Sequence, residues 1–286
     1  MKTAVITGAT SGIGYAAVKA LASEGWRVIG VGRTKENSEA AASKLLAESP
    51  GADVTFVYGD LSQQSDVNRI ADEVTALLDA QGGKLDALIS NAGGVRNWYT
   101  TTEQGYELQF ALNHLAGFLL AHRLLPYLIK AQGRLILTGS NSHKHMRMRW
   151  DDIMFEKRYS PLYAYKQSKL ANMLFAAEFN RRYGDKGVRA YVVDPGLVNT
   201  GIGSKQTGGI VRLFWELHRR RGVSPETSAK THLHLCRLQD CPQGLYYHKC
   251  SPCAYSRYAD SEEDAKRLFE LSEKLCGITF GRSGRQ

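Results

Sequence analysis

Near its N-terminus the sequence reads Thr3-Ala4-Val5-Ile6-Thr7-Gly8-Ala9-Thr10-Ser11-Gly12-Ile13-Gly14, and an alanine-rich helical pattern follows as far as Gly25. The β-branched run at residues 3–7 predicts a short buried strand. A strand, a glycine turn and a helix in this order point backbone N–H groups and a helix N-terminus at a phosphate. Glycine is needed because a side chain would hold a diphosphate away from the backbone. We expect this turn to bind a dinucleotide, and a plain tight turn is the alternative; the binding residues would be Gly8, Thr10, Ser11, Gly12, Ile13 and Gly14.

The residues after the second predicted strand, Arg27 to Gly32, bear on which dinucleotide binds. A chain that binds NAD places a carboxylate there for the ribose hydroxyl groups, whereas this chain has Arg33, with Lys35 close behind. A guanidinium can clamp the 2′-phosphate of NADP. The nearby acid, Glu36, lies beyond the turn. The sequence therefore favours NADP, with NAD as the alternative.

Strand and helix patterns alternate along the chain as far as residue 196. Predicted strands cover 53–58, 87–90, 134–138 and 189–193, and predicted helices lie at about 35–49, within 103–130 and at 161–183. This alternation predicts an α/β fold with a doubly wound parallel sheet, the Rossmann fold, and helices on both faces. Polar and glycine residues follow the strands: Gly8, Asp60, Asn91, Ser140 and Pro195-Gly196. Because ligands bind outside the carboxyl ends of such strands, we expect a site at that edge.

The predicted helix from Pro161 to Tyr183 carries Tyr165 and Lys169 one turn apart on the same face. A phenol with an ordinary pKa of about 10 is a poor proton donor at neutral pH. A neighbouring ammonium lowers that pKa, so the pair can act as an acid and a base if a reactive group lies in front of it. Taken alone, so short a pattern favours an ordinary surface tyrosine and lysine, and the rest of the sequence must support the pair.

The chain has 286 residues, of which 43% are hydrophobic, and it shows no linker or internal repeat. We therefore expect one domain over 1–286, with a glycine-containing lid over the substrate at about 199–223. The sequence shows no signal segment, and the apolar region 110–129 contains polar residues that make it a poor membrane span. The expected localisation is cytoplasmic.

Cysteine usage and charge indicate no further chemistry. Five cysteines without an export signal predict free thiols, and Cys250 and Cys253 lack a second tight pair with which to bind zinc, so we expect no metal site. The net charge of +9 has its densest runs at 143–149 and 218–221. Neither run belongs to a recognisable nucleic-acid module, so a solvated basic face is favoured over guidance of an anionic ligand, and nucleic acid is not expected as a partner.

Taken together, the motifs resemble the short-chain dehydrogenase/reductase family over nearly the whole chain. The resemblance rests on Thr7 to Gly14, Asp60, Asn91-Ala92-Gly93, Asn113, Ser140, Tyr165-x3-Lys169 and Pro195-Gly196-x3-Thr200. A closer similarity to the retinol-dehydrogenase-like branch lies in residues 112–120 and 164–175. Ser90 and Gly139 depart from the family's usual Asn and Ser, although the neighbouring functional positions are kept.

The resemblance implies a role for each matching residue. Tyr165 would exchange a proton with the substrate oxygen, while Lys169 would lower the pKa of Tyr165 and bind the nicotinamide ribose. Ser140 would donate a hydrogen bond to the substrate oxygen, and Asn113 would hold a water that links Lys169 to solvent. The remaining cofactor contacts would come from Asp60 at the adenine, from Val198 and Thr200 at the carboxamide, and from Leu61, Asn91, Ala92, Gly93, Pro195 and Gly196.

These features predict an NADP-dependent oxidoreductase that interconverts a lipophilic carbonyl, a ketone or an aldehyde, and its alcohol by hydride transfer. A non-catalytic NADP-binding scaffold or redox sensor is the alternative, and the complete set of acid–base residues counts against it. The family often pairs the helices that correspond to 103–130 and 161–184, so the resemblance implies a homodimer or homotetramer.

Overall fold

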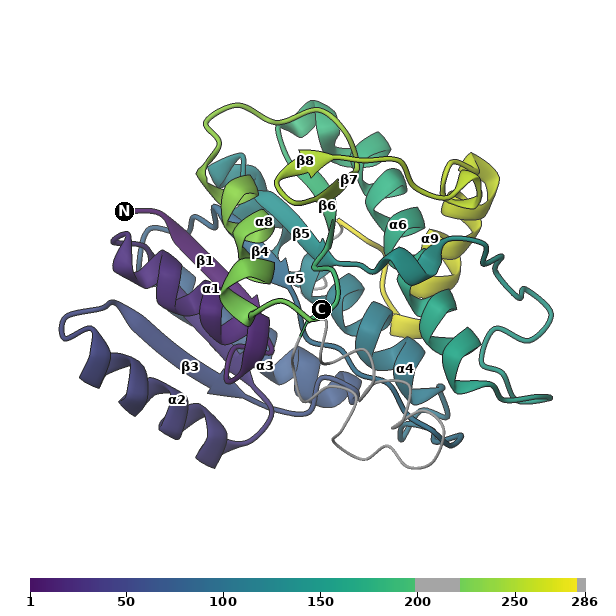
Figure 1. The fold of residues 1–286 in the computed structure, drawn as a ribbon, viewed down its shortest axis with the longest axis horizontal. Coiled ribbons are helices and arrows are strands. Elements are labelled where there is room, and N and C mark those ends of the chain that lie inside the picture. The colour runs from purple at the N-terminus through teal and green to yellow at the C-terminus, as the bar shows by residue number, and fades with distance from the viewer. Residues whose placement is uncertain (199–221, 282–286) are drawn as a thin grey trace.

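The computed structural model describes residues 1–198 and 222–281 and contains one eight-stranded sheet (Figure 1). The strand order is β3-β2-β1-β4-β5-β6-β7-β8, and every neighbouring pair is parallel except β7 with β8. The strands are β1 (Thr3–Thr7), β2 (Arg27–Gly32), β3 (Val54–Tyr58), β4 (Ala87–Ser90), β5 (Arg134–Thr138), β6 (Arg189–Asp194), β7 (Tyr246–His248) and β8 (Ser251–Pro252). The change of direction between β1 and β4 gives the crevice in which doubly wound folds bind ligands.

Helices cover both faces of the sheet (Figure 1). On one face lie α1 (Gly12–Ser23), α2 (Lys35–Glu48) and α8 (Pro225–Arg237). The other face carries α3 (Gln64–Asp79), α5 (Ala116–Ala131), α6 (Pro161–Tyr183) and α9 (Glu262–Cys276). Short helical turns are α4 (Leu108–Phe110), η1 (Ala111–Leu115), η2 (Asn141–His143), η3 (Gly184–Lys186) and η4 (Arg257–Ala259). The Rossmann fold expected from the sequence is confirmed.

Alternation along the central strands explains why there are two cores. In β1, Val5 faces the core beneath α5 and α6, whereas Ala4 and Ile6 face the core beneath α1 and α8. All three side chains are fully buried, as a strand covered on both faces requires. The sheet is thus fixed between two helical layers, and the carboxyl ends of its strands keep their relative positions.

The expected boundaries of α6 are confirmed, since the helix begins at Pro161 and Gly184 caps its C-terminus. Beyond the strands expected from the sequence, β7 and β8 pair through a tight antiparallel hairpin. The lid expected at 199–223 falls almost wholly outside the described residues. Of that stretch, Val223 forms a parallel bridge with Val198.

The C-terminal helix α9 packs along α6, one of the two helices through which the resemblance implies pairing between subunits. Arg182 of α6 stacks over Phe269 of α9 at 3.9 Å. This part of α6 therefore contacts its own chain.

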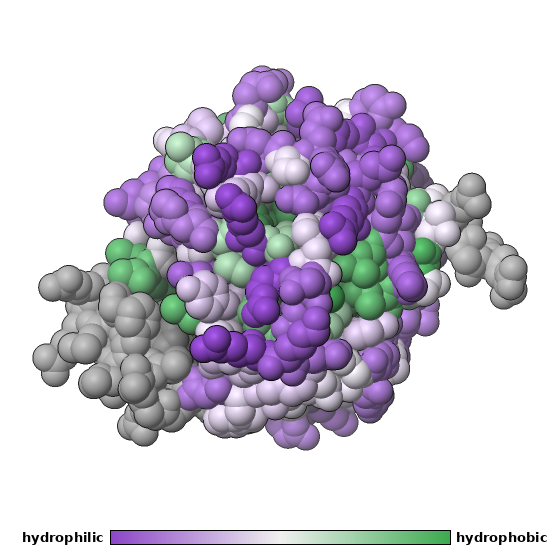
Figure 2. Space-filling model, turned by 90° about the vertical axis from the view of Figure 1, so that its right-hand side faces the viewer, coloured by the Kyte–Doolittle hydropathy of each residue, from purple (hydrophilic) through white to green (hydrophobic). Residues whose placement is uncertain are grey.

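Hydrophilic side chains cover most of the side that Figure 2 presents. None of the described helices is long and apolar enough to cross a membrane.

Candidate active site

Side chains at the carboxyl ends of β1, β4 and β5 are bound to one another. The Thr7 hydroxyl accepts hydrogen bonds from the backbone N–H groups of Asn91 and Ala92, both at 2.9 Å. The amide of Asn91 donates to the Thr7 carbonyl at 3.1 Å and accepts from the Thr138 hydroxyl at 3.4 Å. Asn91 therefore ties the three strand ends together, which is a structural reason for an asparagine at this position.

The glycine turn after β1 has the geometry that close backbone packing demands. A Cβ atom on Gly14 would lie 2.2 Å from the carbonyl oxygen of Gly8 and 2.8 Å from Nδ2 of Asn91. Gly8 and Gly12 have φ values of 66° and 56°, a region that favours glycine. Ser11 is the N-cap of α1, and its side chain makes no capping hydrogen bond. The N-terminus of α1 carries no acidic residue in its first turn, so it can receive an anion.

Lys169 is buried beside the carboxyl end of β5. Its Nζ donates to the carbonyl oxygen of Thr138 at 2.9 Å, and its side chain is 5% exposed. Burial lowers the pKa of Lys169 to about 8. A Cβ atom on Gly93 would lie 3.6 Å from this ammonium, so the turn after β4 passes directly over it. Lys169 can consequently exchange a proton near neutral pH.

Tyr165 and Ser140 face the same space, because the Ser140 hydroxyl lies close enough to act on the pKa of the Tyr165 phenol. Burial raises the pKa of Tyr165 to about 12, the Ser140 hydroxyl opposes that rise, and the Asp194 carboxylate adds to it. The direction is opposite to the lowering by Lys169 that we expected from the sequence. The ammonium lies 5.6 Å from the phenol ring centroid and bonds Thr138 instead. In this state Tyr165 is a protonated phenol, able to donate.

Asn113 lies in the π-helical turn η1, and both its side chain and its backbone carbonyl are engaged. Its Oδ1 accepts from the Gly94 N–H at 2.8 Å, and its Nδ2 donates to the Gly94 carbonyl and to the Ser168 hydroxyl, both at 3.0 Å. The carbonyl oxygen of Asn113 accepts from Asn172 Nδ2 at 2.9 Å. These contacts hold the turn after β4 against α6. The water-holding role of Asn113 stays a prediction.

The predicted adenine side of the site lies at the ends of β2 and β3. Arg33 follows β2 directly and is exposed. Asp60 accepts hydrogen bonds from the backbone N–H and the hydroxyl of Ser62, at 2.9 and 2.8 Å through Oδ1. Leu61 is 6% exposed and belongs to the core beneath α3. The Asp60 loop is thus ordered by its own hydrogen bonds.

Beyond β6 the chain turns at Pro195 and Gly196, and the φ of Gly196 is 73°. Asp194 Oδ1 accepts from the Gly196 N–H at 2.9 Å and so closes the turn. The turn continues to Val198, while Thr200 lies outside the described residues. Every other predicted site residue lies at the carboxyl edge of the sheet or on the segments that face it.

Sequence reasoning missed four buried polar residues that position the predicted ones. Thr7 and Thr138 are the last residues of β1 and β5, and Ser168 and Asn172 lie on α6. For the residues on α6 a signal was present, because positions 165, 168, 169 and 172 share one helical face. A polar side chain inside a strand has no such periodic signal.

The basic run 143–149 lies within the described residues, whereas the run 218–221 lies outside them. In the run 143–149 His143, Met146 and Met148 are buried, whereas His145 and Arg147 are exposed, so the run alternates between the core and a basic face towards solvent. His143 accepts from the Ser256 N–H at 3.2 Å and anchors the segment. The thiol of Cys250 lies 4.0 Å from the Thr231 hydroxyl on α8, whereas Cys253 packs against the opposite core, and both are free.

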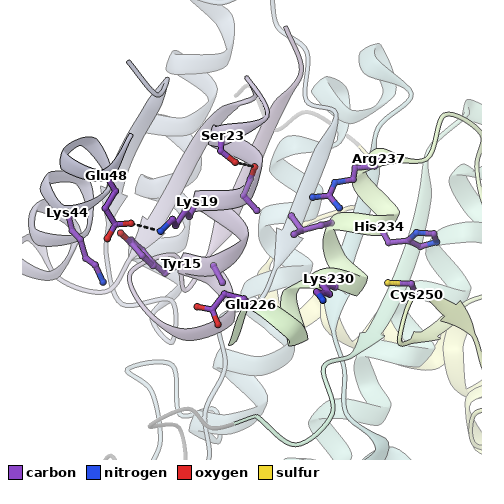
Figure 3. Close-up of a pocket in the computed structure, with 13 residues that line it drawn as sticks. Tyr15, Lys19, Ser23, Lys44, Glu48, Glu226, Lys230, His234, Arg237 and Cys250 are labelled. Carbon is purple, nitrogen blue, oxygen red and sulfur yellow. Dashed lines mark hydrogen bonds and ion pairs between the residues drawn. The ribbon is translucent and has the colours of Figure 1, made fainter. Parts of the chain in front are cut away.

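A concave region lies away from the predicted residues. This groove of about 650 Å³ runs between α1 and α8 (Figure 3). Lys19 pairs with Glu48 at 2.6 Å on its wall. None of the predicted catalytic or cofactor residues lines the groove.

Comparisons with known proteins find relatives over nearly the whole chain. The family model for the short chain dehydrogenase matches residues 2–209. Retinol dehydrogenase 12 of Mus musculus is 35% identical over 98% of this chain and 87% of its own length. Retinol dehydrogenase 13 of Homo sapiens is 33% identical over 97% of this chain and 85% of its own length.

Solved structures share the fold. A crystal structure of an uncharacterized protein from Mycobacterium paratuberculosis is 30% identical, with a TM-score of 0.77 over 99% of this chain and 96% of that one. An alcohol dehydrogenase from Thermococcus sibiricus, complexed with 5-hydroxy-NADP, is 22% identical, with a TM-score of 0.67 over 90% of this chain and 97% of that one. The second similarity concerns the fold alone.

Proposed function

The chain belongs to the short-chain dehydrogenase/reductase family and is an oxidoreductase acting on CH–OH groups, and from that premise we propose an NADP-dependent enzyme that interconverts a lipophilic carbonyl and its alcohol. The observation that carries the proposal is the position of Tyr165 one helical turn from the buried Lys169, whose ammonium lies 5.6 Å from the phenol ring centroid, and close to the Ser140 hydroxyl. The retinol dehydrogenases among its relatives support an apolar substrate. A ketone or an aldehyde would be the oxidised partner.

The chemistry assigns a role to each group. Ser140 would donate to the substrate oxygen, where negative charge develops. Tyr165, with its pKa raised by burial, carries the proton that this oxygen needs when a carbonyl is reduced. Lys169, with a pKa of about 8, can then return a proton to Tyr165 near neutral pH. The dinucleotide would supply or accept the hydride.

Several described residues fit a dinucleotide. Gly8, Gly12 and Gly14 carry no side chains that would hold a diphosphate away from the backbone, and the amide N–H groups at the start of α1 suit the charge of a diphosphate. Lys169, whose Nζ would lie 3.6 Å from a Cβ atom on Gly93, would bind the nicotinamide ribose beside this glycine. The preference for NADP rests on Arg33, exposed directly after β2, where its guanidinium can meet a 2′-phosphate.

The test replaces Tyr165 by Phe and assays a panel of ketones, aldehydes and secondary alcohols. We expect turnover to fall at least about a hundredfold, because general acid catalysis contributes roughly 10²–10⁴. The binding of NADPH and NADH is compared by thermal shift on both variants, and we expect NADPH to give the larger shift on each. Wild-type turnover by the variant would refute the assignment of the proton donor. NADPH binding without turnover on any substrate would instead indicate a scaffold or redox sensor.

A further inference from the structure

A chain of buried hydrogen bonds joins the C-terminal helix α9 to the π-helical turn η1. The Ser272 hydroxyl on α9 lies 2.9 Å from His114 Nε2, and His114 Nδ1 lies 3.2 Å from Asn172 Oδ1. Asn172 Nδ2 donates to the Asn113 carbonyl at 2.9 Å. All four side chains are at most 4% exposed. Polar groups as deeply buried as these are costly to leave unpaired, so the chain resists rearrangement.

The direction of the hydrogen bonds follows from the donors available. The Asn172 amide nitrogen is used by the Asn113 carbonyl, so its oxygen faces His114. His114 is neutral, because burial lowers its pKa to about 4. Its Nδ1 must then carry the proton, and its Nε2 accepts from Ser272, although the Leu268 carbonyl competes for that hydroxyl at 2.8 Å. The donors therefore run from α9 towards Asn113.

The same turn is held from its other side by the residue that precedes Lys169. Asn113 Nδ2 donates to Ser168 Oγ, and Ser168 Oγ donates to the Tyr165 carbonyl at 2.8 Å. Ser168 and Asn172 precede and follow Lys169 in the sequence. Ser168 binds the side chain of Asn113, and Asn172 binds its backbone carbonyl. A rotation of α6 about its axis, or a slide along it, would break both contacts.

We propose that Asn172 is a positioning residue, which fixes α6 against η1 and thereby places Lys169 and Tyr165, with His114 and Ser272 holding its amide in orientation. The proposal rests on the proposed function, because it concerns the placement of the same proton-transfer groups. It assigns a role in the reaction to a helix, α9, that carries none of the reacting groups. Misplacement of reacting groups by about 1 Å can lower a rate by about 10².

The test compares Asn172→Leu with a matched control, Phe179→Leu. Phe179 also lies on α6 and packs against Phe280 at 6.0 Å, but it takes no part in the hydrogen-bond chain. We expect Asn172→Leu to lower kcat by about tenfold or more, to leave the dissociation constant of NADPH within about twofold and to shift the pH profile of kcat. Phe179→Leu should lose comparable thermal stability but keep the wild-type kcat and pH profile.

If Asn172→Leu does not fold, two milder substitutions at Ser272 test the proposal instead. Ser272→Ala should change kcat and the pH profile in the same direction but less, and Ser272→Thr, which keeps the hydroxyl, should restore both. A kcat and a pH profile equal to those of the control, in Asn172→Leu or else in Ser272→Ala, would overturn the proposal. Tyr165→Phe is assayed in parallel: if it is inactive while Asn172→Leu is fully active, only this inference fails, and if it is fully active, the proposed function fails.

Discussion

Among single residues, Lys169 combines a buried charge with a neutral hydrogen-bond partner. Its ammonium donates to the Thr138 carbonyl. Burial lowers its pKa from 10.5 to about 8, a difference that corresponds to roughly 3 kcal/mol against the charged form. A residue retained despite such destabilisation is typical of a functional site. The folded protein is therefore less stable at neutral pH than it would be with an apolar residue at this position.

We predict that Lys169→Met abolishes turnover yet raises the stability at pH 7 by about 1–2 kcal/mol, since the unpaired Thr138 carbonyl offsets part of the gain. Below pH 8 Lys169 is protonated in both the folded and the unfolded state, so the wild type carries the full free-energy cost of burying this charge. Between pH 8 and 10.5 the unfolded state binds more protons, so the wild type gains stability and the difference shrinks. Urea unfolding from about pH 7 to about pH 10 measures this, with the partly exposed Lys166→Met as the control. A difference that does not change with pH would contradict the prediction.

Tyr165 shows what a sequence can and cannot predict about a residue. Its spacing from Lys169 and its place on α6 were predictable, because helical periodicity places side chains on a common face. The direction of its pKa was not, because that depends on burial and on the carboxylate of Asp194, which ends a different element, β6. A local sequence pattern does not show which residues from distant segments lie close together in the fold.

Among the elements, the turn between β1 and α1 owes its shape to the absence of side chains. Gly14 lies within the first turn of α1 and directly faces the carbonyl oxygen of Gly8. Any side chain there would push α1 away from the end of β1 and from Asn91. The turn was predictable from the sequence because glycine spacing reports such close approaches directly.

We predict that Gly14→Ala destabilises the protein by about 1–3 kcal/mol and weakens NADPH binding, because the backbone on both sides of the clash must move. Gly184→Ala is the control, since Gly184 has a φ of −63° and no atom within 4 Å of an added Cβ. It should change stability by no more than about 0.5 kcal/mol. Urea unfolding and a thermal-shift titration with NADPH measure the two effects. Equal behaviour of the two variants would contradict the account of the turn.

The turn η1 marks the limit of prediction for elements. The sequence indicated a helix-rich segment over 103–130, yet the structure has a π-helical turn at Ala111–Leu115 before α5. Apolar periodicity does not distinguish the two, because the local residues suit either helix. The wide turn is stabilised by Asn172 and Ser168 of α6, partners that only the tertiary fold brings near.

In the molecule as a whole, the last described residues complete the core beneath α6. Phe280 is 6% exposed, and its ring lies 5.0 Å from Phe118 of α5 and 5.0 Å from Phe269 of α9. Its N–H donates to Glu273, which orients the segment after α9. The closing helix was predictable from its acidic first turn, but the packing of the residue beyond it was not. Helices distant in the sequence are thus joined through one ring.

We predict that Phe280→Ala destabilises the protein by about 3 kcal/mol, because it leaves a cavity among several aromatic rings. Since α9 carries Ser272, the loosened helix should also lower kcat, but less than Asn172→Leu does. Tyr163→Ala, which removes a ring that is 54% exposed, should change stability by no more than about 0.5 kcal/mol. Urea unfolding monitored by circular dichroism compares the two variants. A loss for Phe280→Ala no larger than that for Tyr163→Ala would mean that the C-terminal segment contributes little to the core, and that α9 holds its place against α6 without it.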